Sequence, residues 1–299
     1  MRSNYAKGVV MALGTAMLWG GMSPLAKYIG SRGLSMVSVM CYRAVLIVLL
    51  MGVWLSLTSG RGWYRIDKKL ACTYVMLAFL TVVLNACGFL VSCVYLTVPQ
   101  ALMIHYTFPL VTMAGSYFIT GERPSWIQTA AGFLIVVGLY VGFAGGAGVG
   151  GVSFKGVVWG TVSVIGLSGQ TLVSRRILKD GATDPLIQLF YIHLFGGAMV
   201  ILGKSLWLGW SDIRAIDLTV FALMQYAALG PGLFGFGLMF SALKFIPASL
   251  VSLICTLELV FALVITPIAL RQYPTPNELI GCAVIVVAVA CATVQKKQA

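Results

Sequence analysis

The sequence predicts an all-α integral membrane protein, in which ten transmembrane helices form two inverted five-helix repeats with both termini cytoplasmic. Two observations carry this prediction. Of the 299 residues, 60% are hydrophobic and 9% are charged, against about 25% charged in an average soluble domain. So few charges cannot cover a soluble protein, and most of the surface must therefore face lipid. In addition, apolar runs of the roughly 20 residues that a bilayer requires follow one another along the whole chain.

Charges, glycines and prolines delimit these apolar runs. Several prolines stand near the start of a run, where the missing N–H costs a helix least. They are Pro99, Pro185, Pro247 and Pro276. The pattern predicts spans over 8–29, 36–57, 70–95, 98–119, 125–144, 154–175, 185–203, 219–243, 247–270 and 276–294.

Basic residues are distributed unevenly between the two sides that these spans define. The N-terminus and the connections after even-numbered spans carry 13 Lys and Arg, the other side carries 6, and Arg43 lies within the second span. Because cytoplasmic loops retain positive residues, we expect both termini on the cytoplasmic side of the membrane. The net charge of +12 is dispersed over short loops, which argues against a nucleic-acid partner.

The two halves of the chain resemble each other. Residues 95–102 match residues 243–250, and each segment contains a proline. Because each half has an odd number of spans, the halves enter the membrane from opposite faces, as in carriers whose substrate site lies between inverted repeats. The expected division is a first repeat over 1–144, a glycine-rich linker over 145–153 and a second repeat over 154–299.

Nothing in the sequence indicates a cofactor or a metal. The linker holds a Gly-x-Gly-x-x-Gly pattern over 146–151, but a nucleotide site needs that pattern between a strand and a helix. The seven cysteines fall inside apolar runs, without the paired spacing of a zinc or redox site. We therefore predict that the protein uses neither a cofactor nor a metal.

Short motifs along nearly the whole chain carry a family resemblance. They are Leu18-Trp19-Gly20 in the first span, Arg43 in the second, Gly121-Glu122-Arg123 after the fourth, and Pro247-Ala248-Ser249 through Leu257-Glu258 in the ninth. In this order they resemble the drug/metabolite transporter superfamily, specifically the EamA-type ten-helix carriers and, among these, the YddG-like amino-acid exporters. The resemblance implies a carrier of small metabolites, often amino acids moved outward, with a central cavity formed mainly by helices 1, 3, 4, 6, 8 and 9.

The second repeat departs from the family pattern at two places. Leu259 stands where a proline commonly follows the glutamate, and Leu270-Arg271-Gln272 replaces the usual Gly-Glu. The first departure removes the residue that would be expected to break the ninth helix.

Ionisable groups at membrane depth are costly and are therefore functional candidates. Glu258 is the only acidic residue well inside a predicted span, and His105 lies in the fourth span. Either side chain could serve proton coupling. The structural alternatives are a helix-to-helix pairing for Glu258 and a hydrogen-bonded core position for His105. Arg43 could bind a substrate carboxylate or anchor neighbouring helix ends.

Aromatic and uncharged polar residues complete a lining that suits a small amphiphilic solute. The predicted substrate-binding residues are Trp19, Asn85, His105, Tyr106, Phe108, Ser168, Gln170, Gln225, Tyr226 and Glu258. Prolines and glycines inside spans interrupt helices and could act as hinges, although close helix packing uses small residues as well. The hinge candidates are Gly20, Pro24, Pro109, Gly230 and Pro231.

These observations favour a secondary-active, alternating-access transporter over an enzyme. We expect it to export amino acids or related small metabolites, as a monomer or homodimer and with proton coupling as one option. The alternatives are a multidrug or cation efflux carrier of the same fold, a channel, and a rhomboid-like intramembrane protease. The protease would use Ser168, within Gly166-Leu167-Ser168-Gly169, and His193 as its base. These two residues fall on adjacent helices, however, whereas the rhomboid pattern separates them by an intervening helix.

Overall fold

The computed structural model describes residues 2–60, 62–144, 152–271 and 273–294. Within these ranges every regular element is a helix, and ten stretches are long and apolar enough to cross a membrane. Their bounds lie within five residues of the predicted ones at either end, so the predicted fold class and spans are confirmed. The predicted linker lies almost wholly outside the described residues.

Aspartates at the helix starts explain several of these boundaries. Asp67, Asp184 and Asp217 each accept a hydrogen bond from a backbone N–H in the first turn of the helix that follows, which satisfies a donor that has no intrahelical partner. Spans 1 to 5 comprise α1 (Arg2–Gly20) with α2 (Met22–Ser31), α3 (Met36–Thr58), α4 (Lys68–Ala78) with η1 (Phe79–Cys87) and α5 (Gly88–Tyr95), α6 (Val98–His105) with α7 (Phe108–Ile119), and α8 (Trp126–Ala144).

The second half follows the same plan. Spans 6 to 10 comprise α9 (Phe154–Lys179), α10 (Pro185–Gly203) with η2 (Lys204–Leu208), α11 (Leu218–Ala227) with η4 (Ala228–Gly235) and α12 (Phe236–Phe245), α13 (Ala248–Cys255) with α14 (Glu258–Leu270), and α15 (Pro276–Val294). The short helix η3 (Ser211–Ala215) lies in the connection between spans 7 and 8. Segments η1, η2 and η4 are π-helical.

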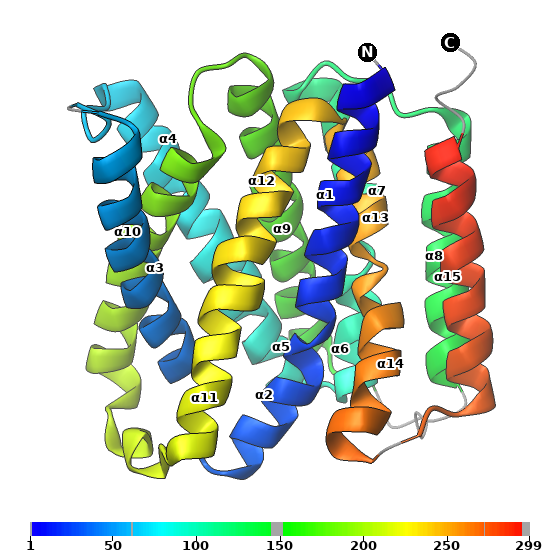
Figure 1. Ribbon diagram of the computed structural model, residues 1–299. Coiled ribbons are helices and arrows are strands. Elements are labelled where there is room, and N and C mark those ends of the chain that lie inside the picture. Colours follow the sequence, from blue (N-terminus) through cyan, green and yellow to red (C-terminus); the bar gives the residue numbers. More distant parts are fainter. Residues whose placement is uncertain (1, 61, 145–151, 272, 295–299) are drawn as a thin grey trace.

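The spans run alternately up and down, so that α1 begins and α15 ends at the same face of the bundle (Figure 1). We call this the terminal face and the other the opposite face. The connection between spans 4 and 5 lies at the terminal face, and the connection between spans 7 and 8 lies at the opposite face. Which face is cytoplasmic remains a prediction from the basic residues.

An internal repeat is visible in the helix boundaries. A displacement of 150 residues relates Val98–His105 to Ala248–Cys255, and the same displacement relates Trp126–Ala144 to Pro276–Val294. Spans 3 and 8 both contain a π-helical segment. The displacement places Thr97, the N-cap of α6, rather than Pro99, opposite Pro247, the N-cap of α13. The matching of residues 95–102 with 243–250 is therefore two residues out of register.

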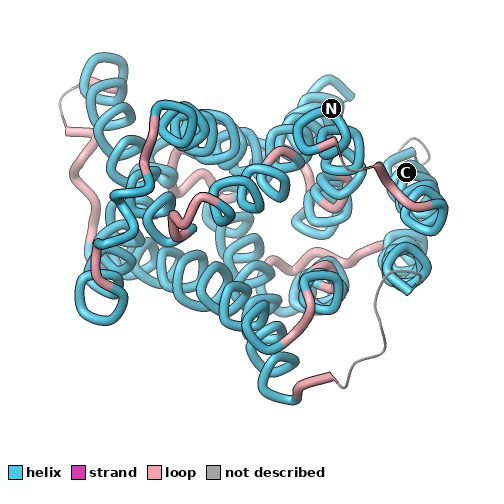
Figure 2. Tube along the Cα trace, turned by 90° about the horizontal axis from the view of Figure 1, so that it is seen from below, coloured by secondary structure: helices cyan, strands magenta, loops and turns pink. Residues whose placement is uncertain are grey.

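The centre and the edge of the bundle differ in burial. Spans 6 and 8 each have 56% of their most apolar window buried inside the protein, whereas spans 5 and 10 have 28%. Spans 5 and 10 pack on each other at one edge, where α15 lies beside α8 (Figure 2). The contact is close because a Cβ atom on Gly281 would lie 2.4 Å from the carbonyl oxygen of Gly138. Spans 5 and 10 therefore form an edge of the bundle, and the candidate site is expected among the more buried spans.

Candidate substrate and coupling site

Two repeat-related spans are broken halfway across the bundle. Span 4 is interrupted between His105 and Phe108, and span 9 between Cys255 and Glu258. In span 4, Pro109 is the second residue of α7 and has no N–H to continue the helical ladder. Span 9 has Leu259 in place of such a proline, and the sequence therefore provided no reason to expect a break there. Span 9 is nevertheless broken, so that expectation is wrong.

A threonine at each break helps to interrupt the helix in both spans. Thr107 donates its hydroxyl to the carbonyl of Ile104 at 2.7 Å, and Thr256 donates to Leu253 at 2.6 Å. A hydroxyl that occupies a carbonyl of the preceding turn competes with the backbone hydrogen bonds that a continuous helix needs. The backbone N–H of Thr256 also turns back to Leu253, at 3.3 Å, so the chain tightens locally and α14 begins anew.

Glu258 and Tyr106 join the two breaks. The Tyr106 hydroxyl donates a hydrogen bond to Oε1 of Glu258. Tyr106 is buried at the end of α6, and the half-buried Glu258 is the first residue of α14. Glu258, the acidic residue predicted to lie well inside a span, therefore meets the other repeat of the protein at mid-depth.

His105 lies in a second polar group next to Tyr106. Its Nδ1 is 2.9 Å from the hydroxyl oxygen of Ser163 on α9, and Ser163 donates to Oδ1 of Asn85 on η1 at 3.2 Å. Because the hydroxyl gives its single proton to Asn85, it accepts one from Nδ1 of His105. The neutral imidazole then keeps Nε2 as a free acceptor. The ring packs against Phe89, with 4.8 Å between ring centres.

Trp19 and Tyr226 lie where span 1 meets span 8. The Trp19 indole N–H donates to the carbonyl of Pro231 at 3.1 Å, and its ring lies 5.0 Å from that of Phe236. The Tyr226 hydroxyl is 3.5 Å from the carbonyl of Leu18. It occupies space that only a glycine leaves open, because a Cβ on Gly21 would lie 2.3 Å from the hydroxyl oxygen.

Other predicted site residues lie apart from this cluster. Ser168 is buried and donates to the carbonyl of Phe108 at 3.0 Å, which supports the backbone just after the break in span 4. Gln170 is fully buried, and neither atom of its amide has a hydrogen-bond partner among the described residues. Gln225 donates to Tyr42, between α11 and α3. These three residues support or adjoin the site rather than meet Glu258.

The hinge candidates lie at interruptions of the helices. Gly20 ends α1, and a Cβ there would lie 3.0 Å from the carbonyl oxygen of Glu258. Pro24 is buried in the first turn of α2, and Pro109 is in the first turn of α7. Gly230 and Pro231 are in the π-helical segment η4. All five positions thus lie at a helix end, in a first turn or in a π-helical segment.

The protease arrangement does not form. Ser168 donates to a backbone carbonyl, and Nδ1 of His193 lies 2.9 Å from the carbonyl oxygen of Leu189, one turn earlier on α10. Among the described residues no hydrogen bond joins Ser168 to His193. Ser168 and His193 thus each bond to a backbone carbonyl rather than to each other.

A cavity of about 280 Å³ lies on the side of the opposite face, just below the range of about 300–1,000 Å³ for small-molecule pockets. Its lining includes Ser23 of α2, Leu102 of α6, and Leu259 and Thr266 of α14, together with residues of α8 and α15. Predicted site residues do not line it, but Leu259 directly follows Glu258. The cavity therefore approaches the breaks from the opposite face.

Comparison with protein families decides the class of the molecule. The model of the EamA-like transporter family matches residues 6–143 and, a second time, residues 154–294. The chain belongs to the EamA-like transporter family. It is thus a multi-pass membrane transporter of small molecules, which agrees with its ten apolar spans among the described residues. No curated protein matches the chain significantly.

A solved structure supports the EamA fold. The chain is similar to a protein of known crystal structure, with a TM-score of 0.79 and 17% sequence identity. The similarity covers 98% of this chain and 99% of the other. At this identity the comparison supports the fold and leaves the substrate open.

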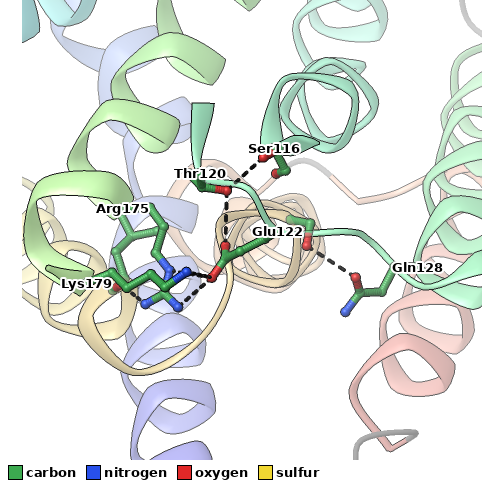
Figure 3. Close-up of polar contacts among 8 residues, drawn as sticks. Ser116, Thr120, Glu122, Gln128, Arg175 and Lys179 are labelled. Atoms are coloured by element: carbon green, nitrogen blue, oxygen red, sulfur yellow. Dashed lines mark hydrogen bonds and ion pairs between the residues drawn. The ribbon is translucent and has the colours of Figure 1, made fainter. Parts of the chain in front are cut away.

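In this EamA-like transporter, an ion-pair network ties the two repeats together at the terminal face. Arg175 of α9 donates to Oε1 of Glu122 through Nε at 3.0 Å and Nη2 at 2.6 Å (Figure 3). Its Nη1 donates to the carbonyl of Leu243 at the end of α12, at 2.5 Å. Lys179 approaches the same carboxylate at 3.7 Å. Sequence reasoning placed Glu122 in a family motif but missed its partner, which looked like an ordinary basic loop residue.

A separate polar network lies at the opposite face. Asp212 on η3 accepts hydrogen bonds from the Ser35 N–H at 3.0 Å, the Ser38 hydroxyl at 2.5 Å and the Lys204 ammonium at 2.9 Å. Desolvation alone would raise the pKa of Asp212, but the hydrogen bonds from Ser38 and Lys204 outweigh it and lower the pKa below its ordinary value. The network fixes the loop between spans 7 and 8 to the start of α3.

Proposed function

We propose that this EamA-like transporter is a secondary-active, alternating-access carrier that exports amino acids or related small metabolites across the bacterial inner membrane. The observation that carries the proposal is the Tyr106–Glu258 hydrogen bond between the broken spans of the two repeats. Carriers built from inverted repeats commonly hold substrate at such a place.

The chemistry around the breaks matches both ends of an amino acid. The Glu258 carboxylate can pair with a substrate ammonium group. Helices α7 and α14 begin at the breaks, and the positive ends of their helix dipoles are suited to a carboxylate. The Phe89 ring packs against His105, and Trp19 directly precedes Gly20, where a Cβ would lie 3.0 Å from the Glu258 carbonyl oxygen; these two aromatic rings would contact an apolar side chain.

Two side chains are suited to coupling. Glu258 can exchange a proton when it alternates between Tyr106 and a substrate, and His105 presents a free Nε2 in the same region. A carrier that uses Glu258 for both proton and substrate couples them, because the two compete for one carboxylate.

The orientation follows from charge. With the terminal face in the cytoplasm, the 13 basic residues of that side obey the positive-inside rule. The Glu122–Arg175 network then closes the cytoplasmic side, and the cavity near Leu259 belongs to the periplasmic side. In the same proposal, 1–144 and 154–299 are the two repeats that rock against each other.

The test is ligand binding followed by counterflow. Purified protein in detergent is heated with single amino acids, lipophilic cations and nucleotide sugars, because a ligand that binds only the folded state raises the apparent stability. Each stabilising compound is then loaded into proteoliposomes, and saturable exchange of the labelled compound is measured. Stabilisation and exchange with one class of amino acids is the expected result.

Two other results would redirect the assignment. Stabilisation by lipophilic cations alone identifies a multidrug or cation efflux carrier, in which Glu258 would pair with the cation. Flux that does not saturate and shows no counterflow identifies a channel.

A further inference from the structure

Arg43 is a cation inside the bundle that has no hydrogen-bonding partner among the described residues. It lies seven residues into α3, about 10 Å from the helix start at 1.5 Å per residue. Its Nε atom is completely covered and unpaired within the described part of the chain. Its stem packs on Gly232 of η4, where a Cβ would lie 2.7 Å from Cδ of the arginine. The guanidinium carbon lies 5.7 Å from the ring centre of Phe236.

No carboxylate balances this charge. The chain contains eight acidic residues, and all of them are among the described residues. Their ion pairs involve Arg32, Arg175, Lys179 and Lys204, and none involves Arg43. Glu258, the acid inside a span, is bonded to Tyr106 instead. An unpaired cation at membrane depth is expensive, so a negative charge from outside the chain would stabilise the fold.

A small cavity adjoins Arg43. It lies between spans 2, 3, 7 and 8 and is lined by Arg43, Thr81, His193 and Phe236, among others. The centre of a water-sized sphere can occupy about 20 Å³ in this cavity. By the same measure, about 10–15 Å³ is enough to hold one water molecule. A single monatomic ion therefore fits, whereas an amino acid does not.

The repeat brings a second nitrogen-bearing side chain to the same place. His193 stands 150 residues after Arg43, the displacement that relates α6 to α13, so the two are repeat-related positions on spans 2 and 7. The Leu189 carbonyl can only accept, so Nδ1 of His193 carries a proton. Its Nε2 is not used by any hydrogen bond among the described residues. Because Nδ1 holds the single proton of the neutral imidazole, Nε2 can only accept, so the charge on Arg43 is what attracts an anion to this cavity.

We propose that the cavity between spans 2, 3, 7 and 8 binds one chloride-sized anion, which Arg43 holds by charge and His193 and Thr81 surround. A water molecule would fill the same space but would leave the arginine charge uncompensated. The cavity that would hold the anion has none of the residues at the breaks of spans 4 and 9 in its lining. It is therefore separate from the proposed substrate site.

The first test is the effect of chloride on thermal unfolding. Purified protein is heated in sodium gluconate, and chloride replaces gluconate stepwise at constant sodium concentration and ionic strength. The wild type is expected to gain about 3 °C or more in Tm and to saturate. Arg43→Gln is expected to show no chloride dependence. Arg65→Gln, which removes an exposed arginine in the loop before α4, is expected to respond like the wild type.

The outcomes separate a bound anion from a general salt effect. An equal response to chloride in wild type and Arg43→Gln overturns the proposal. So does a response to glycine that is as large as the response to chloride, because glycine carries no net negative charge to balance Arg43.

A second measurement needs no variant. Line broadening of ³⁵Cl nuclear magnetic resonance by the wild-type protein is expected, and bromide should reverse it by competing for the site. Absence of broadening beyond that of empty micelles overturns the proposal. Neither measurement depends on transport, so a failure here leaves the proposed function untouched and a failure of counterflow leaves the anion site untouched.

Discussion

Lys204 is a buried charge whose partner lies in the connection between spans 7 and 8. Lys204 has 1% of its side chain exposed, and its ammonium group meets Asp212 across a bend of the chain and the Trp210 ring at 5.0 Å. Asp212 in turn holds Ser35 and Ser38 at the start of α3. A lysine in this position is tolerated because its charge is matched and each acceptor is used.

Asp212→Asn is expected to lower the free energy of unfolding by about 3 kcal/mol at pH 7, because it leaves the Lys204 charge buried without its counter-ion. Thermal unfolding in detergent measures the change. Asp180→Asn, at an exposed position of the terminal face, should leave the Tm unchanged. A loss of the same size in both variants would contradict the assignment.

The same carboxyl predicts a dependence on pH. The pKa of Asp212 is lower in the folded protein than its ordinary value, so the stabilisation is fully present above about pH 4, the unfolded value. It is lost as the pH falls through the lower, folded-state pKa. The Tm difference between wild type and Asp212→Asn should therefore be constant from pH 8 to about 5 and shrink in more acidic solution. A difference that grows on acidification would be inconsistent with this sign.

Glu258→Gln is expected to reduce exchange of the substrate at least about tenfold and to flatten its pH dependence, because the amide keeps the shape but cannot bind a proton. Counterflow in proteoliposomes over a pH series measures both effects. Glu278→Gln is the matched control, since glutamine can keep the capping contact with Thr275. His105→Ala tests the neighbouring group, and unchanged rates and pH profiles in both site variants would refute the coupling role.

Helix interruptions are the decisive feature at the scale of elements. Spans 4 and 9 break at positions related by the repeat, although only span 4 has a proline just after its break. Span 9 instead uses the hydroxyl and backbone of Thr256. The shared geometry therefore comes from the fold, with different local chemistry in each half.

Leu259→Pro is expected to be tolerated, with a loss of at most about 1 kcal/mol for the hydrogen bond that its N–H makes to Thr256 at 3.2 Å. Position 259 corresponds to Pro109 in the repeat, and the first turn of a helix accommodates proline. Leu263→Pro, inside α14, should cost about 3 kcal/mol or more. Thermal unfolding of the two variants compares them, and equal losses would show that span 9 is not broken.

The packing of the edge helices gives another prediction. Gly281→Ala places a Cβ atom against the backbone of α8, 2.4 Å from the Gly138 carbonyl oxygen, and separation of the helices should cost about 1–3 kcal/mol. Gly30→Ala, in α2, has no atom within 4 Å of the added Cβ and should not destabilise. A comparison of the two Tm values checks this, and similar values would contradict close packing of spans 5 and 10.

At the scale of the whole molecule, the two faces are held differently. Glu122 and Arg175 connect the first repeat to the second at the terminal face, with 14% and 8% of their side chains exposed. The cavity near Leu259 and Thr266 lies on the other side of the breaks. In the proposed alternating-access cycle, the pair at the terminal face must separate before that face can open.

Glu122→Gln is expected to shift the population toward a state open at the terminal face, because a buried pair worth about 3 kcal/mol is lost in the closed state alone. Hydrogen exchange measured by mass spectrometry should become faster over 116–125 and 240–247 and slower over 23–34. Faster exchange at both faces would indicate general destabilisation instead. Asp180→Asn, at the same face, serves as the control.

Local patterns in the sequence were sufficient to predict the spans and the internal repeat, and they made Glu258 a candidate site residue. Apolar length and flanking charge are properties of short segments, so they can be read without knowing what packs where. The same reasoning placed His105, Tyr106, Asn85 and Glu258 in one predicted site, and the structure pairs Tyr106 with Glu258 and His105 with Ser163. Sequence reasoning gave no reason to expect that Ser168, Gln170 and Gln225 would lie apart from Glu258.

The sequence by itself determined that this chain crosses a membrane ten times and repeats its plan, because lipid demands long apolar helices whatever their neighbours. Tertiary structure alone decided the partners. It broke span 9 at Thr256 without a proline, paired Arg175 with Glu122, and left Arg43 beside His193 without a carboxylate. These outcomes depend on the rotation and depth of packed helices, and residues far apart in the sequence set them together.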